Sequence, residues 1–117
     1  MTLIIPRSLE IERALLAALI LDARHYPRVR ARIIPDLFDN ALHRALAGVY
    51  QRIDAAGLDI TMPTVLDEID RDEATSIRFR DTAEGMALLV SLSDGSAPSN
   101  AAESYLRLAE EWAAKRN

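Results

Sequence analysis

The chain has 117 residues and a formal charge of −4; half of its residues are apolar, 5% are aromatic and none is cysteine. This length has room for one hydrophobic core, and the abundance of Ala and Leu predicts an all-α fold. The absence of cysteine excludes disulfides, thiolate chemistry and cysteine-based zinc sites, and no apolar stretch reaches the roughly 18 residues of a membrane span.

The N-terminal part of the chain predicts an apolar lead-in followed by a first helix. Residues 1–7 form the lead-in, and Ser8 is the candidate N-cap of the helix. Glu10 and Glu12 follow in the first turn, where we expect their carboxylates to complement the helix dipole. Apolar residues at helical spacing then extend the predicted helix over about 9–22.

The next segment predicts a short helix, a turn and a long helix. Pro27 can open the short helix, Pro35 stops it, and Phe38 is expected to be buried in the turn that follows. The long helix ends at Gly57, which suits the residue after a helix because glycine adopts left-handed dihedrals without strain. His43 lies beside the apolar stripe of this helix, and we expect it to be partly buried with one hydrogen bond.

The second half of the chain predicts three further helices and a loop. Thr61 is the expected cap of a fourth helix, and the charged segment 71–80, which lacks a clear period, is interpreted as a loop. A fifth helix is expected over about 83–93. The turn Ser93-Asp94-Gly95-Ser96 leads to a last helix that Pro98 opens and that runs to about residue 116.

The last two helices are joined by a short turn, and this arrangement predicts an αα-hairpin. We therefore expect a single domain that consists of a helical globule over about 8–71 and a C-terminal helical hairpin over about 82–117. The hairpin carries many apolar side chains, and we interpret its surface as an interface with a second copy or another protein. Its use in the core of the chain itself is the alternative. The candidate contact residues are Met86, Leu89, Tyr105, Leu108 and Trp112.

Charge is distributed unevenly along the sequence. Residues 1–52 carry a balance of +3 and residues 53–117 a balance of −7. DNA binding through phosphate neutralisation needs a basic face, and the chain offers only a small cluster of Arg24, Arg28, Arg30 and Arg32. We expect this cluster to be the solvated side of the short helix, paired with nearby acids, so direct nucleic-acid binding is not expected. The acidic half suits a basic protein partner.

Motifs for catalysis and for cofactor binding are missing from the sequence. There is no G-x-x-x-x-G-K-[ST] loop for phosphates, and the chain has only four glycines. The two histidines, His25 and His43, are eighteen residues apart and form no H-E-x-x-H pattern. We therefore expect no enzymatic activity, no metal and no cofactor in this chain alone.

The order of several short motifs resembles the N-terminal domain of DnaB-type replicative DNA helicases. The opening motif consists of Pro6, Ser8, Glu10 and Glu12, and it is followed at the family's distance by Leu21-Asp22. Further matches are Tyr26, Val29, Ile33, Asp36, Phe38, His43, Gly57, Ile60, Thr64, Leu66, Pro98-Ser99 and Tyr105. The chain departs from the family where Ala17-Ala18 replaces a Gly-Gly pair and where Glu84-Gly85-Met86 replaces the usual start of the fifth helix.

This resemblance implies a non-catalytic interaction domain, and the lack of cysteine, of a membrane span and of a signal peptide predicts a cytoplasmic protein. In the family, the domain precedes a RecA-like motor, assembles as a trimer of dimers and docks the C-terminal domain of primase. It implies dimers, a hexamer in the full-length helicase, and primase or a helicase loader as partners here; ATP-dependent unwinding would belong to the motor domain. The alternative is a stand-alone adaptor or regulator of phage or plasmid type that binds a helicase, and the reading frame after Asn117 would separate the two.

Overall fold

The computed structural model describes residues 7–94 and 99–116, and these residues form helices and connecting turns without any strand. The helices are α1 (Arg7–Leu21), α2 (Tyr26–Val29), α3 (Ala41–Ala55), α4 (Met62–Asp70), α5 (Glu73–Arg80), α6 (Ala83–Ser93) and α7 (Ala102–Arg116), with short 3-10 turns η1 (Pro35–Leu37) and η2 (Ser99–Ala101). The expected all-α fold is confirmed. The predicted lead-in up to Pro6, the second half of the turn at 93–96 and the helix start at Pro98 lie outside the described residues.

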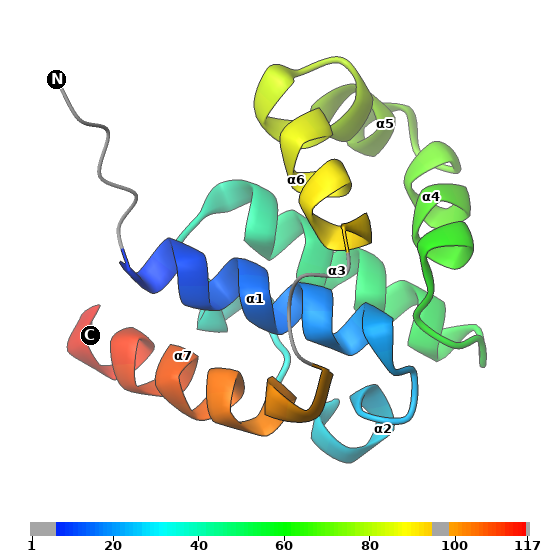
Figure 1. The fold of residues 1–117 in the computed structure, drawn as a ribbon. Coiled ribbons are helices and arrows are strands. Elements are labelled where there is room, and N and C mark those ends of the chain that lie inside the picture. The colour runs from blue at the N-terminus through cyan, green and yellow to red at the C-terminus, as the bar shows by residue number, and fades with distance from the viewer. Residues whose placement is uncertain (1–6, 95–98, 117) are drawn as a thin grey trace, which may run out of the picture.

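Helix α1 lies at the centre of the fold and packs against α3, α6 and α7 (Figure 1). The stretch Leu15–Leu19 is buried on every side, with no residue more than 5% exposed. A helix segment that is apolar all round must be covered by several neighbours, and here α7 runs along α1 while α3, α4, α5 and α6 each pack on the next. One continuous core therefore joins the two parts of the chain that the sequence suggested.

The last two helices do not form the expected hairpin. Helix α7 packs chiefly against α1, and α6 packs against both α1 and α5; Figure 1 shows α1 between α6 and α7. Helix α7 buries Ala102, Leu106 and Ala109 in the core. The physical reason is that the apolar surface of α1 is wide enough to need a helix on each side. Much of the surface that the sequence assigned to a partner therefore covers the chain's own core.

Helix α5 replaces the loop that the sequence predicted over 71–80. The side chain of Asp72 caps it by accepting a hydrogen bond from the backbone N–H of Thr75 at 3.0 Å. Phe79 is fully buried and fixes the helix to the core. Because Phe79 is its only buried residue, the helix has no apolar stripe from which periodicity could have revealed it.

Side chains cap α3 and α4 as the capping rules predict, whereas the expected cap of α1 is not found. Asn40 caps α3 by accepting from the backbone N–H groups of Leu42 and His43, and Thr61 caps α4. The expectation for Ser8 is wrong, because α1 already begins at Arg7 and Ser8 lies within its first turn. No helix among the residues that the structure describes is long and apolar enough to cross a membrane.

Gly57 ends α3 in the left-handed conformation, with φ at 76°. Its N–H donates to Asp54 O at 2.9 Å, and the N–H of Leu58 donates to Ile53 O at 3.2 Å, so these two carbonyls of the last turn are satisfied. We expect Gly57→Ala to lower the free energy of unfolding by about 1–2 kcal/mol, because a side chain is strained at positive φ although no atom blocks it. Urea denaturation followed by circular dichroism measures this; an unchanged midpoint would contradict it.

Candidate functional site

Glu12 is the one buried carboxylate among the described residues, with 2% of its surface exposed. Its Oε1 lies 2.7 Å from Nδ1 of His43, and its Oε2 accepts a hydrogen bond from the backbone N–H of Asp39 at 2.8 Å. The backbone N–H of Asn40 also points to this carboxylate, at 3.5 Å. The expectation that Glu12 serves the dipole of its own helix is therefore wrong: its carboxylate binds α3 and the turn before it.

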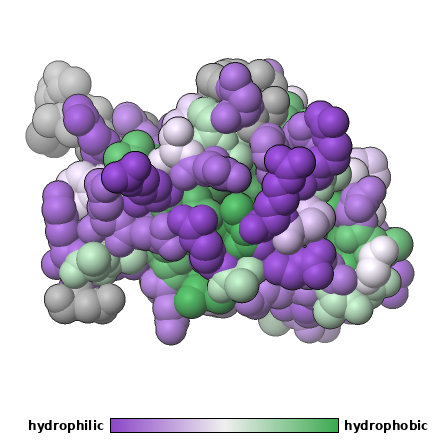
Figure 2. Space-filling view, turned by 90° about the horizontal axis from the view of Figure 1, so that it is seen from below, coloured by the Kyte–Doolittle hydropathy of each residue, from purple (hydrophilic) through white to green (hydrophobic). Residues whose placement is uncertain are grey.

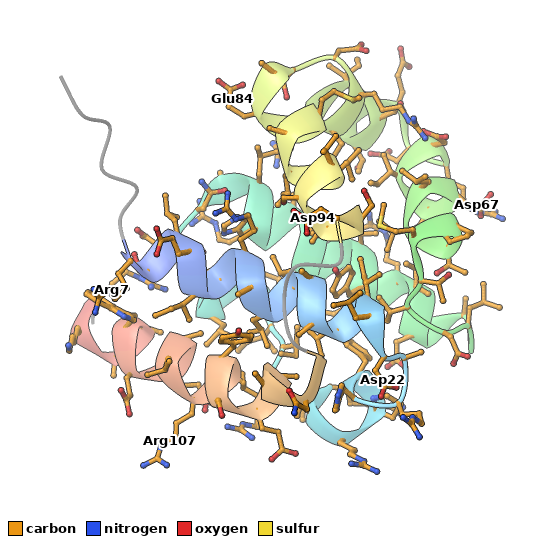
Figure 3. All side chains as sticks on the ribbon, in the orientation of Figure 1. Arg7, Asp22, Asp67, Glu84, Asp94 and Arg107 are labelled. Atoms are coloured by element: carbon orange, nitrogen blue, oxygen red, sulfur yellow. The ribbon has the colours of Figure 1, made fainter. Side chains whose placement is uncertain are left out.

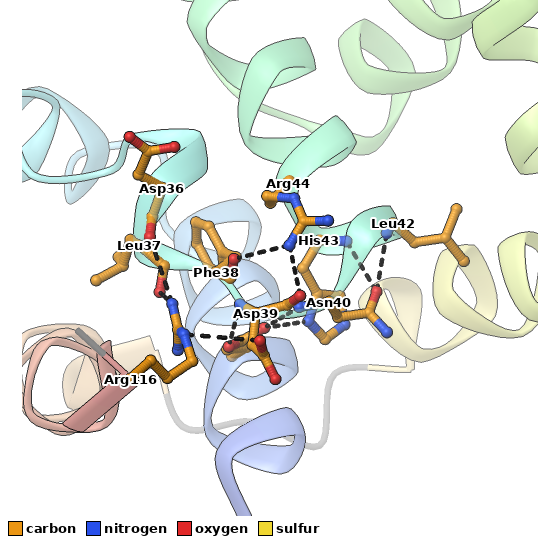
Figure 4. Close-up of polar contacts among 10 residues, drawn as sticks. Asp36, Leu37, Phe38, Asp39, Asn40, Leu42, His43, Arg44 and Arg116 are labelled. Atoms are coloured by element: carbon orange, nitrogen blue, oxygen red, sulfur yellow. Dashed lines mark hydrogen bonds and ion pairs between the residues drawn. The ribbon is translucent and has the colours of Figure 1, made fainter. Parts of the chain in front are cut away.

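His43 completes this polar cluster from the first turn of α3 (Figure 4). It is 6% exposed, and its ring meets the ring of Phe38 edge to face, with centroids 6.4 Å apart. Phe38 is buried at 1% exposure, as expected for the turn. The histidine is thus held by one carboxylate and one aromatic ring, and it is buried more deeply than the partial burial that the sequence predicted.

The C-terminal end of α7 reaches the same turn. Arg116 donates from Nη2 to the carbonyl oxygen of Leu37 at 3.1 Å and lies 3.6 Å from the carboxylate of Asp39. Arg44 of α3 donates to the carbonyl of Asp39 from the other side (Figure 4). These contacts tie three helices to one turn, and no group of His, Asp or Glu side chains in the described part of the chain is placed to hold a metal. The role of this cluster is therefore structural: it connects α1, α3 and α7 through the turn before α3.

The candidate interface residues separate into buried and exposed ones. Leu89 is only 6% exposed and belongs to the core, so it offers no surface to a partner. Met86 is 44% exposed and Leu108 is 40% exposed, but they lie on helices that pack on different sides of α1. Tyr105 and Trp112 are half-buried. The five residues therefore do not form one continuous surface.

Helix α6 carries a second apolar side that sequence reasoning did not delimit. Gly85, Leu88, Leu89 and Leu92 face the core. The opposite side, which we name the outer α6 face, consists of Ala83, Met86 and Val90, all exposed, with Val90 at 62%. The residues recur at helical spacing and carry no charge. The sequence signal that α6 is apolar on more than one side was present, but only the packing separates the inner side from the outer one.

The arginine cluster is mostly neutralised by acids. The side chain of Arg24 donates two hydrogen bonds to Asp22 at 2.8 and 3.0 Å and thereby lowers the pKa of that carboxyl. Arg32 binds both oxygens of Glu110 on α7, at 2.5 and 3.1 Å, and the pKa of Glu110 is lowered for the same reason.

Arg30 lies 3.4 Å from Asp54, so three of the four cluster arginines have an acidic partner. Figure 3 shows charged side chains such as Glu84 and Arg107 projecting from opposite sides of the fold. Figure 2, seen from below the view of Figure 1, shows small hydrophobic groups divided by hydrophilic side chains on that face. The acidic partners of Arg24, Arg30 and Arg32 agree with the expected solvated role of these arginines.

Comparison with known proteins gives one family. A family model described as the DnaB-like helicase N terminal domain matches residues 4–111, which is most of the chain. No curated protein matches the chain.

Proposed function

Because the chain belongs to the family of DnaB-like helicase N-terminal domains, we propose that it works as the interaction domain of a replicative helicase. In this proposal it joins helicase subunits to one another and receives primase or a helicase loader during DNA replication. The chemistry of unwinding belongs to a motor domain of the helicase, and this domain contributes assembly and docking.

The outer α6 face carries the proposal. Met86 and Val90 are exposed at 44% and 62% on a helix whose other side already fills the core. Removing a side chain of this size from water contributes about 1.5–3 kcal/mol when its burial is complete. A surface without charge on an otherwise charged protein favours contact with a second copy, because two identical uncharged faces do not repel each other.

We expect the isolated domain to dimerise through this face. In sedimentation experiments, the sedimentation coefficient should rise with concentration, and the double variant Met86→Glu, Val90→Glu should remain a monomer with unchanged helical circular dichroism. Leu58→Glu is the matched control, because Leu58 is 53% exposed but lies beyond the end of α3. A strict monomer at high concentration, or a dimer that survives both glutamates, would refute the assignment.

Disulfide trapping locates the contact independently, because the chain has no native cysteine. A single Val90→Cys variant should form a covalent dimer under mild oxidation, whereas Leu58→Cys should not. Titration with the purified C-terminal domain of a primase tests the docking role in the same preparation. Failure of that titration with an intact dimer would remove docking from the proposal and leave assembly.

A further inference from the structure

A pocket of about 170 Å³ lies where the N-terminal parts of α1, α3 and α6 meet. Its apolar wall is formed by Leu9, Leu42, Ala87 and Leu88. An apolar cavity of about 150 Å³ is known to hold a benzene molecule, so the pocket of about 170 Å³ has room for one aromatic ring. Neither the structural role of the Glu12–His43 cluster nor the proposed role of the outer α6 face accounts for this pocket.

His43 brings a polar atom to the wall of this pocket. The residue is only 6% exposed, and its ring lines the pocket. Nδ1 is bound to Glu12, so Nε2 is the nitrogen left for a further partner. In the described part of the chain, no side-chain nitrogen or oxygen is both buried and without a hydrogen bond. Nε2, which bonds to no group of the described residues, is therefore accessible from the pocket.

Two arginines and one glutamate lie around the opening of the pocket and of the hollow beside it. Arg13 lines the pocket, and Arg78 lines an adjoining hollow that shares Asn40, Leu42 and Glu84 with it. The guanidinium groups of Arg13 and Arg78 make no ion pair or hydrogen bond with the described residues, although most arginines of this acidic protein are paired with an acid. Glu84 offsets one of the two charges. One positive charge thus remains uncompensated at an apolar opening, and it favours a carboxylate.

We propose that this pocket binds a tyrosine side chain on a segment of a partner protein, with an acidic residue next to the tyrosine. The ring fills the apolar space, and the phenol hydroxyl meets Nε2 of His43. A phenol hydroxyl both donates and accepts, so this contact forms whether the imidazole is neutral or protonated. The adjacent carboxylate lies between Arg13 and Arg78, where it finds the unpaired positive charge.

The inference does not depend on the proposed function, because the pocket and the outer α6 face use different residues. Met86 and Val90 do not line the pocket. The variant Met86→Glu, Val90→Glu therefore separates the two assignments: it should abolish dimerisation and leave the pocket functional. Loss of peptide binding in this variant would place the peptide on the outer α6 face and overturn the inference.

The probes are three blocked peptides titrated into the ¹⁵N-labelled full chain: acetyl-Tyr-Glu-amide, acetyl-Phe-Glu-amide and acetyl-Tyr-Gln-amide. The first should shift the amide signals of Leu42, His43 and Ala87 saturably. Each of the other two should bind about 3- to 10-fold more weakly, because each removes one hydrogen-bonded or charged contact. Equal affinity of the phenylalanine peptide would overturn the role of His43, and the absence of saturable shifts would overturn the site.

Two alanines on α6 give a matched pair of variants. Ala87→Phe places a ring in the pocket wall and should abolish binding, whereas Ala83→Phe adds the same ring to an exposed position outside the pocket and should not. Arg13→Gln should weaken binding. Arg28→Gln should not, because Arg28 is exposed and does not line the pocket. Binding that persists in Ala87→Phe would refute the location, and equal losses in both arginine variants would refute the charge argument.

Discussion

Gly85→Ala is expected to lower the free energy of unfolding by about 3 kcal/mol or more. A Cβ atom at this position would lie 2.5 Å from the carbonyl oxygen of Arg78 and 2.6 Å from Cα of Phe79. Both are backbone atoms of α5, which cannot move aside as a flexible side chain can. The start of α6 would have to separate from α5 and would lift Phe79 from the core. Urea denaturation followed by circular dichroism measures the loss.

Gly48→Ala is the matched control for this variant. Gly48 also lies inside a helix, but the nearest atom to an added Cβ is the guanidinium of Arg52 at an ordinary 3.6 Å. Alanine stabilises an open helical position by about 1 kcal/mol relative to glycine, so this variant should be neutral or more stable. If both substitutions stabilise the protein, the close approach of α5 and α6 is wrong.

Glu12→Ala is expected to lower the free energy of unfolding by about 2–4 kcal/mol, because each buried donor that loses its acceptor costs about 1–3 kcal/mol. The variant leaves the imidazole of His43 and the backbone N–H of Asp39 buried without their acceptor. A domain of this size has a total stability on the order of 10 kcal/mol. The loss is therefore a large share of the stability, and the thermal midpoint should fall clearly.

Glu10→Ala tests whether the loss of stability in Glu12→Ala arises because the Glu12 carboxylate is buried. Glu10 is an exposed acid two residues earlier on the same helix, and its removal should change the stability by only about 0.5 kcal/mol. The double variant with His43→Ala should cost less than the sum of the single ones, because the two side chains contact each other. Equal effects of Glu10 and Glu12 would contradict the buried pair.

Helix propensity and periodicity predicted much of the secondary structure because those signals are local. The apolar stripe of α3, its end at Gly57 and the buried ring of Phe38 all follow from neighbouring residues. The segment of α5 escaped prediction because one buried aromatic residue, Phe79, holds a charged helix that has no stripe. One buried residue creates no repeating apolar pattern along the sequence, so periodicity cannot reveal such a helix.

The buried pair of Glu12 and His43 shows the same limit for polar groups. The residues are 31 positions apart, and each has an ordinary alternative role on the surface of its own helix. Only the packing of α1 on α3 places the carboxylate beside the imidazole and the backbone N–H groups of the turn. The pocket next to His43 arises from the same packing and could not be foreseen.

The exposed apolar surface near the C-terminus is smaller than the sequence predicted, because part of it covers the core. The sequence by itself determined the helical class, the family resemblance that the match over residues 4–111 confirms, and the excess of apolar side chains near the C-terminus. Only the tertiary structure decided that Leu89 fills the core while Met86 and Val90 stay exposed. The reason is geometric: a helix that is apolar all round does not encode which side is inward, and the close contact of α5 at Gly85 fixes that choice.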